Sequence, residues 1–308
     1  MAKKKKKIIL RSFIIFLVIN ICIFSVIPFR IMSSMVDKHV DFKKILTPEE
    51  YGLNAKHFFV KTEDGMNIST YEVAVDTPKV VIICLAGIHG PSVTEFFGHA
   101  KLFKEQSYST ILLDMRAHGE SDGNKICLGY KEHLDVKAVV QYIKQQPIYN
   151  NIPIVLMGYS MGAATAINSI GKIPEIDGLV SLSSFSSWEE IFYENMKKSA
   201  PKIIAVIEYP FVYSTTFLKY GTSSFTKPKN EIKKLGSRPA LLMHSKEDSQ
   251  VSFANYERLL KSAPSHVETF VRDGDLHRMT ENFTEPEKDI EYSGELLSFI
   301  RKHFIEKR

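Results

Sequence analysis

The chain has 308 residues, 44% of them hydrophobic and 24% charged, a composition that gives no reason to expect long disordered stretches. The lysines at positions 3–7 contribute five positive charges to a net charge of +5, so the rest of the chain is close to neutral. A near-neutral body without a basic stripe argues against a nucleic-acid-binding protein.

The N-terminal lysines precede an uncharged apolar run over residues 12–29. Extended back to Ile8, this segment reaches the roughly 20 residues needed to span a hydrocarbon core. Basic residues are denser before the run than after it, which places the N-terminus in the cytoplasm. The sequence therefore predicts a single-pass anchor in the cell membrane (residues 1–30), followed by a linker (31–50) and an extracytoplasmic body.

A cleaved signal peptide would also have a basic start and an apolar stretch. No Ala-x-Ala-like cleavage site follows the run, and its length suits an anchor, so we favour an uncleaved anchor. The three cysteines lie far apart and form no metal-binding pattern. Cys84 and Cys127 could pair outside the cytoplasm, but the sequence favours unpaired thiols.

Residues 51–308 alternate between strand-like and helix-like segments. A hairpin is expected over residues 57–61 and 68–75, because Glu63-Asp-Gly between them is typical of a turn. Regular alternation of strands and helices predicts a mainly parallel sheet of about eight strands with helices on both faces. The further strands are expected at 80–85, 109–114, 154–157, 178–182, 239–244 and 267–271, and the helices at 94–106, 131–146, 161–170, 253–261 and 289–303.

Residues 184–236 break the alternation. They are aromatic-rich and look irregular, and they lie between two predicted strands, so an insertion over the sheet is expected rather than a separate domain. Their apolar side chains, among them Ile203, Ile204, Val206 and Ile207, could line a pocket for an acyl chain. They could equally bury the underside of the insertion.

The strongest local signal is Gly158-Tyr159-Ser160-Met161-Gly162, directly after the strand at 154–157 and before a helix. A sharp strand-to-helix turn forces its central residue into a strained conformation, and the flanking glycines leave room for it. The turn exposes the Ser160 hydroxyl near a helix N-terminus, where we expect a nucleophile.

A serine nucleophile needs a base, and the base needs an orienting acid. Among the downstream histidines, His277 follows the last predicted strand and so lies at the same sheet edge as Ser160. His266 precedes that strand at the opposite edge, and His303 belongs to the terminal helix. His277 is therefore the predicted base.

The acid should follow the preceding strand, where the loop contains Glu247 and Asp248. The pattern His244-x-x-x-Asp248-x-x-Val251 favours Asp248 and leaves Glu247 as the alternative. Asp273 and Asp275 are expected to shape the turn before the predicted base.

Backbone N–H groups are also needed to stabilise an oxyanion. Met161, the residue after the nucleophile, should supply one. The second should come from the loop after Leu85, where Pro91 has no N–H and Ile88 is the workable donor.

With these residues in place, the chain resembles the α/β-hydrolase superfamily, in particular its single-domain esterase, lipase and serine-aminopeptidase-like members. The resemblance runs from about His57 to the C-terminal helix. It rests on the 158–162 motif, on the later acid and histidine, and on residues 114–123, which are similar to the family's Asp-x-Arg-Gly-x-Gly-x-Ser motif. That motif implies a structural role for His118. Ala86-Gly87 departs from the His-Gly that the family often has before the oxyanion donor, and Ala117 from a usual glycine.

The resemblance implies an α/β-hydrolase fold with residues 184–236 as a cap insertion, and a Ser160-Asp248-His277 triad that cleaves an ester-like bond in a small-molecule or lipid-like acyl substrate. No metal or organic cofactor is implied. Acyl transfer and amide or peptide cleavage use the same triad and stay open, and a catalytically silent binding protein of this fold is the alternative from another class.

Overall fold

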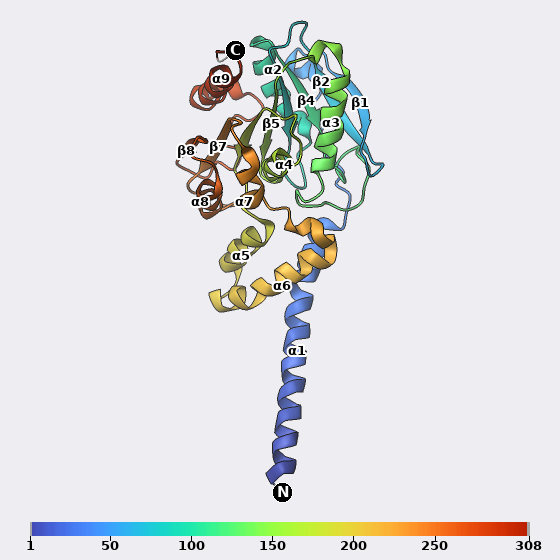
Figure 1. Ribbon diagram of the computed structural model, residues 1–308, viewed down its shortest axis with the longest axis vertical. Helices are drawn as coiled ribbons and strands as arrows, with labels where there is room; N and C mark the ends of the chain where they lie inside the picture. Colours follow the sequence, from blue (N-terminus) through green and yellow to red (C-terminus); the bar gives the residue numbers. More distant parts are fainter. Residues whose placement is uncertain (1, 307–308) are drawn as a thin grey trace.

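The computed structural model describes residues 2–306, which form one eight-stranded sheet covered by helices on both faces and a long N-terminal helix that projects away from it (Figure 1). The strands lie in the order β1-β2-β4-β3-β5-β6-β7-β8. Pairing is antiparallel from β1 to β4 and parallel from β4 to β8, which confirms the predicted mainly parallel sheet. The strands are β1 (Lys56–Lys61), β2 (Asn67–Val73), β3 (Val80–Leu85), β4 (Tyr108–Leu113), β5 (Ile154–Tyr159), β6 (Gly178–Leu182), β7 (Ala240–Ser245) and β8 (Glu268–Arg272).

The two sides of the sheet are two separate apolar clusters, and the alternation of side chains along each strand divides its residues between them. In β3, Ile83 and Leu85 face one cluster, while Ile82 and Cys84 face the other. The first cluster is covered by α3 (His133–Gln145), α4 (Met161–Ile170) and α8 (Phe253–Ser262), and the second by α2 (Phe97–Glu105) and α9 (Ile290–Phe304). Cys127 lies in the first cluster, so Cys84 and Cys127 are separated by the sheet and remain free thiols.

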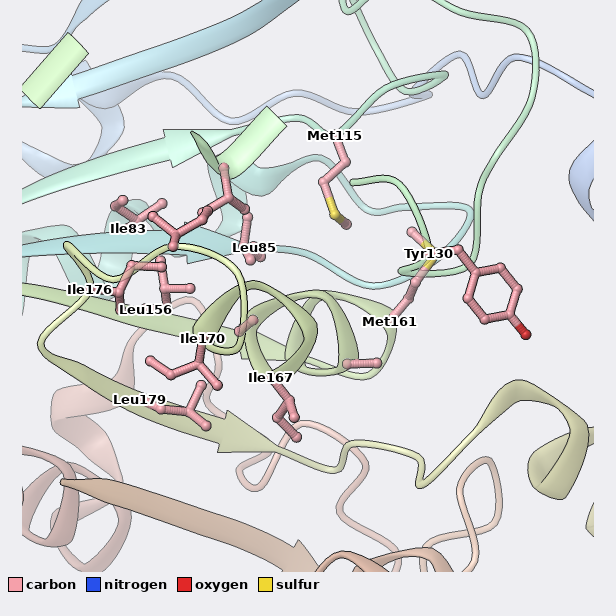
Figure 2. Close-up of a cluster of buried hydrophobic side chains, with 14 of the residues drawn as sticks. Ile83, Leu85, Met115, Tyr130, Leu156, Met161, Ile167, Ile170, Ile176 and Leu179 are labelled. Carbon is pink, nitrogen blue, oxygen red and sulfur yellow. The ribbon is translucent and has the colours of Figure 1, made fainter. Parts of the chain in front are cut away.

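Helix α4 is the element that fixes the start of the candidate site. Figure 2 shows Ile167 and Ile170 of α4 packed over Leu156 of β5 and Leu179 of β6. Every residue of α4 is buried, so the helix cannot shift without opening the core.

Helix α1 (Ala2–Val36) leaves the body as a long stalk (Figure 1). Its apolar residues before Pro28 are almost all exposed, and it is long and apolar enough to cross a membrane. The helix continues to Val36, so the first six residues of the expected linker are helical. Met32 and Val36 are fully buried in the first cluster, which attaches the stalk to the body.

The expectation that residues 184–236 are irregular was wrong. Between β6 and β7 they form α5 (Trp188–Ser199), α6 (Lys202–Tyr220) and α7 (Pro228–Glu231), with one short 3₁₀ turn after α6 and another after α7. Aromatic and β-branched residues have low helix propensity, and Pro210 interrupts the pattern of α6. The helices form because their inner faces pack on one another, on α1 and on the body, which propensity does not report.

The 114–123 stretch fixes the loop after β4. The Arg116 guanidinium is buried between the carboxylates of Asp135 (2.7 Å) and Asp64 (2.8 Å). The ring of His118 is also buried and bonds to the Arg116 carbonyl (3.0 Å). These contacts are structural and lie outside the cleft that contains Ser160.

Asp114, at the end of β4, gives the folded protein a specific pH dependence. Burial raises the pKa of Asp114 to about 7, although its carboxylate accepts hydrogen bonds from the Val93 N–H (2.8 Å) and the Ser92 hydroxyl (3.2 Å). Since the unfolded value is near 3.8, the folded state holds a proton that the unfolded state has lost between about pH 4 and 7. The stabilisation that this bound proton gives the folded state is complete below about pH 4 and is lost as the pH rises to about 7.

We therefore expect Asp114→Asn, which cannot ionise, to gain stability relative to the wild type as the pH rises from 4 to 7. The gain should reach a few kcal/mol, at about 1.4 kcal/mol for each pH unit between the two pKa values. Urea titrations at a series of pH values measure it. A difference in unfolding free energy that does not change with pH would contradict this assignment.

Candidate active site

Ser160 occupies a strained turn between β5 and α4. Its backbone has φ 54° and ψ −121°, a conformation that non-glycine residues rarely adopt and that is typical of functional sites. The Ser160 N–H donates to the Leu182 carbonyl (2.9 Å), and the Ser160 carbonyl accepts from the Ala164 N–H (3.0 Å). Two backbone hydrogen bonds therefore hold this residue in place independently of its side chain.

The glycines on either side of Ser160 make the turn sterically possible. A Cβ atom on Gly162 would lie 2.2 Å from the Leu85 carbonyl oxygen, because β3 and the first turn of α4 touch there. A Cβ atom on Gly158 would lie 2.5 Å from the Gly162 backbone. Both positions therefore require glycine.

We expect Gly162→Ala to destabilise the protein by more than about 4 kcal/mol, because the obstruction is backbone and cannot rotate away. Gly294→Ala in α9 is the matched control, since nothing lies within 4 Å of its Cβ position. Alanine in a helix interior should stabilise it by up to about 1 kcal/mol. Thermal unfolding of both variants measures the difference, and similar melting temperatures would contradict the packing argument.

The loop after β7 surrounds the carboxylate of Asp248, which is buried. Its Oδ1 accepts from the N–H groups of Gln250 (2.9 Å) and Val251 (2.9 Å). The His244 ring bonds to the Val251 carbonyl (2.9 Å), which explains the His244-x-x-x-Asp248-x-x-Val251 spacing. The neighbouring Glu247 is exposed and bonds instead to the Gly274 N–H.

His277 lies in the loop after β8 and turns its ring toward Asp248. The His277 Nδ1 atom is 2.8 Å from Asp248 Oδ2. Burial opposes ionisation of Asp248, but the hydrogen bond and charge of His277 and the two backbone N–H groups outweigh it, so the pKa of Asp248 is below its usual value. The carboxylate is therefore ionised at neutral pH and can hold the imidazole in the tautomer with hydrogen on Nδ1.

Residues that the sequence did not single out position this histidine loop. The Ser245 hydroxyl, at the end of β7, accepts from the Leu276 N–H (2.9 Å). The Arg272 guanidinium donates to the Met279 carbonyl (2.8 Å) and forms an ion pair with Asp289 (2.6 Å). These contacts link strand ends to the start of α9, and no local sequence pattern reports them.

Ser160 and His277 line the same cleft, which has a volume of about 500 Å³. Among the described residues 2–306, no hydrogen bond joins the side chains of Ser160 and His277. Such hydrogen bonds are often long or absent before substrate binds. Ile88 lines the cleft beside Ser160. Met161 is the first residue of α4, where N–H groups have no intrahelical acceptor.

The mouth of the cleft is polar. An ion pair between Glu95 and Arg278 joins the segment after β3 to the histidine loop. Asp275 and Glu281, both exposed, add carboxylates. Charged side chains therefore surround the entrance to the cleft.

Other sequence candidates lie elsewhere. His266 bonds to the Arg238 carbonyl, and His303 on α9 lies 2.5 Å from Glu268, both at the edge of the sheet opposite to Ser160. Asp273 pairs with Lys246, and Asp275 accepts from the Ser249 N–H, as expected of residues that shape the turn. Within residues 2–306, no three His, Cys, Asp or Glu side chains are grouped so that they could hold a metal ion.

The insertion does not contribute to the cleft, whose described lining residues all lie outside 184–236. Helix α5 instead forms an apolar pocket of about 280 Å³ with the end of α1. Trp188, Phe192, Ile31 and Met35 are among its lining residues. The Met35 carbonyl also bonds to the His89 ring (2.6 Å), so the end of α1 touches the loop that carries Ile88.

Comparison with known proteins adds to this geometry. A model of the serine aminopeptidase family S33 matches residues 76–238, which include the turn at Ser160. The chain belongs to this family. Asp248 and His277 lie beyond the matched residues, so their assignment depends on the geometry described above.

Individual relatives are distant. Over 232 residues the chain is 25% identical to the Bacillus subtilis protein YqkD, covering 72% of this chain and 73% of that one. An uncharacterized membrane protein of Saccharomyces cerevisiae is 24% identical over 157 residues, covering 50% of this chain and 52% of that one. The solved structure of the Pyrococcus furiosus esterase Pf2001 matches with a TM-score of 0.69 at 22% identity, covering 87% of this chain and 99% of that one. The protein is an α/β-hydrolase of the serine-hydrolase type.

Proposed function

We propose that this S33 family member cleaves carboxylic esters through a covalent acyl-enzyme formed on Ser160. The observation that carries the proposal is the 2.8 Å contact between His277 Nδ1 and the buried Asp248 carboxylate, in a cleft shared with a serine on a strained turn. A base whose tautomer is fixed by a buried acid can accept a proton from a nearby hydroxyl.

In the first half of the reaction, Ser160 Oγ attacks the ester carbonyl carbon while His277 Nε2 takes the hydroxyl proton. The N–H groups of Ile88 and Met161 stabilise the negative oxygen of the tetrahedral intermediate. His277 then gives the proton to the departing alkoxide, and the acyl group stays on Ser160.

In the second half, His277 takes a proton from water, and the resulting hydroxide attacks the acyl carbon. The intermediate collapses, the acid is released, and His277 returns the proton to Ser160 Oγ. Asp248 stays ionised throughout and stabilises the imidazolium that forms in each half.

We also propose that α1 anchors the enzyme in a membrane, with the N-terminal lysines in the cytoplasm and the hydrolase domain, from residue 51, on the other side. The exposed apolar surface of α1 and the membrane-protein name of the yeast relative support an anchor. The lysines at 3–7 support the orientation.

Hydrolysis of p-nitrophenyl esters of increasing acyl length, by the full-length protein in detergent, tests the proposal. We expect turnover of the short esters, because the cleft of about 500 Å³ admits a small acyl group and its leaving group. Folded protein that hydrolyses none of the series would contradict an esterase.

A second candidate is cleavage of an amide next to a free amino group. The carboxylates of Asp275 and Glu281 at the cleft mouth favour it, because they would attract a substrate ammonium. Aminoacyl p-nitroanilides and their N-acetylated forms distinguish the two. Faster cleavage of the free amines supports this candidate, and no cleavage of either form rejects it.

A further inference from the structure

Helix α6 exposes an apolar face, unlike helices on the surface of water-soluble proteins. Surface helices normally turn charged residues outward and apolar residues inward. Between Ile203 and Leu218 no exposed side chain is charged, and Glu208 on the inner face is buried. Leu218 is 74% exposed and Ile203 is 62% exposed. The exposed positions are Ile203, Val206, Ile207, Pro210, Ser214, Phe217 and Leu218.

The contacts between α6 and α1 show where along the length of α1 the two helices cross. The rings of Phe211 and Phe24 stack with centroids 6.2 Å apart, and Lys219 Nζ lies 4.7 Å from the centre of the Phe29 ring. Phe29 ends the apolar run of α1. Phe24 is five residues inside that run, or about 8 Å at 1.5 Å per residue. Helix α6 therefore crosses α1 at the outer end of the segment that spans the membrane.

An ion pair holds this crossing together. Lys219 has a buried side chain and lies 2.5 Å from Asp37, just beyond the end of α1. The Lys125 ammonium donates to the Lys219 carbonyl (2.8 Å), which connects α6 to the body. Figure 1 shows α6 running across α1 rather than along it, at the end of the body nearest the stalk. The depth of α6 is therefore set by the depth of α1.

We propose that α6 lies in the interfacial layer of the bilayer, with Ile203, Val206, Ile207, Phe217 and Leu218 inserted among the lipid acyl chains. Helices of this kind insert about 5–10 Å below the headgroups, which agrees with the level of Phe24. This proposal depends on the anchoring of α1 proposed above, but not on the catalytic residues.

The partner is lipid rather than a second protein chain, because this face adjoins side chains of α1 that themselves meet lipid. Val26 and Phe29 are exposed on the same stretch of α1 where Phe24 contacts α6. Lys202 is exposed at the start of α6, where an ammonium group can reach the phosphates of the headgroups. The insertion that contains α6 would then rest on the membrane.

Quenching of bimane by nitroxide-labelled lipids tests the insertion, with the full-length protein labelled on a single cysteine and reconstituted in phosphatidylcholine vesicles. Native Cys22 is exposed on α1, while Cys84 and Cys127 are buried, so the wild type reports on the anchor. Leu218→Cys, in a Cys22→Ser background, reports on α6. Ile290→Cys in the same Cys22→Ser background is the matched control, because Ile290 is an equally apolar residue, 82% exposed, at the start of α9.

We expect bimane at Leu218→Cys to lose most of its fluorescence, and to be quenched more strongly by a nitroxide near the carbonyl end of the acyl chain than by one near the methyl end. Bimane at Ile290→Cys should keep its fluorescence. Quenching at Cys22 without quenching at Leu218→Cys overturns the proposal for α6 and leaves the anchor intact. If neither Cys22 nor Leu218→Cys is quenched, the proposed membrane anchor is overturned as well.

Discussion

Replacing Ser160 by alanine is expected to lower kcat for ester hydrolysis by roughly 10⁴- to 10⁶-fold, because the proposed acyl-enzyme forms on the Ser160 hydroxyl. The fold should be retained, since the hydrogen bonds that hold this turn, to Leu182 and Ala164, use only the backbone. The measurement is steady-state turnover of p-nitrophenyl acetate together with thermal unfolding.

Ser169→Ala in the same helix is the control. Its hydroxyl donates to the Thr165 carbonyl (2.8 Å), one turn back in α4, and it lies away from the cleft. We expect turnover of this variant to stay near the wild-type value. A Ser160→Ala protein that keeps its turnover would reject the acyl-enzyme mechanism.

Replacing Asp248 by asparagine is expected to lower kcat by about 10⁴-fold, the scale seen when the acid of a serine-hydrolase triad is neutralised. An amide NH₂ facing His277 Nδ1 favours the tautomer that carries hydrogen on Nε2. That tautomer cannot take a proton from Ser160. The Asn side-chain oxygen can still accept from the Gln250 and Val251 N–H groups, so the loop should keep its shape.

Glu247→Gln is the matched control, because it neutralises the adjacent carboxylate, which the sequence left as the alternative acid. Glu247 is exposed and bonds to the Gly274 N–H, so its loss should change kcat only a few-fold. A large loss in Glu247→Gln with normal turnover in Asp248→Asn would reverse the assignment of the acid.

The parts of the site that could be predicted from the sequence depend on short, local patterns. The turn at Ser160 is encoded in five consecutive residues, since the glycines at 158 and 162 are required by contacts with the neighbouring backbone. Strand order pointed to the loops that contain Asp248 and His277, because residues after neighbouring parallel strands meet at one sheet edge. The spacing from His244 to Val251 then favoured Asp248 over Glu247.

Features that depend on contacts distant in sequence could not be predicted. The Glu95–Arg278 pair at the cleft mouth joins residues 183 positions apart. Helix α6 was not predicted from the sequence. Its apolar residues face outward, so it lacks the pattern of a buried apolar face and an exposed polar face that identifies a surface helix. Phe211 packs on Phe24 and so joins the insertion to the N-terminal helix, but the sequence of neither segment predicts this contact.

In the proposed mechanism, His277 and Asp248 make Ser160 nucleophilic. The most direct test is intact-mass spectrometry of the full-length protein after reaction with a fluorophosphonate probe, followed by peptide mapping. We expect a single adduct on Ser160 that is lost in His277→Ala. No adduct on folded wild-type protein, or an adduct on another residue, would contradict it.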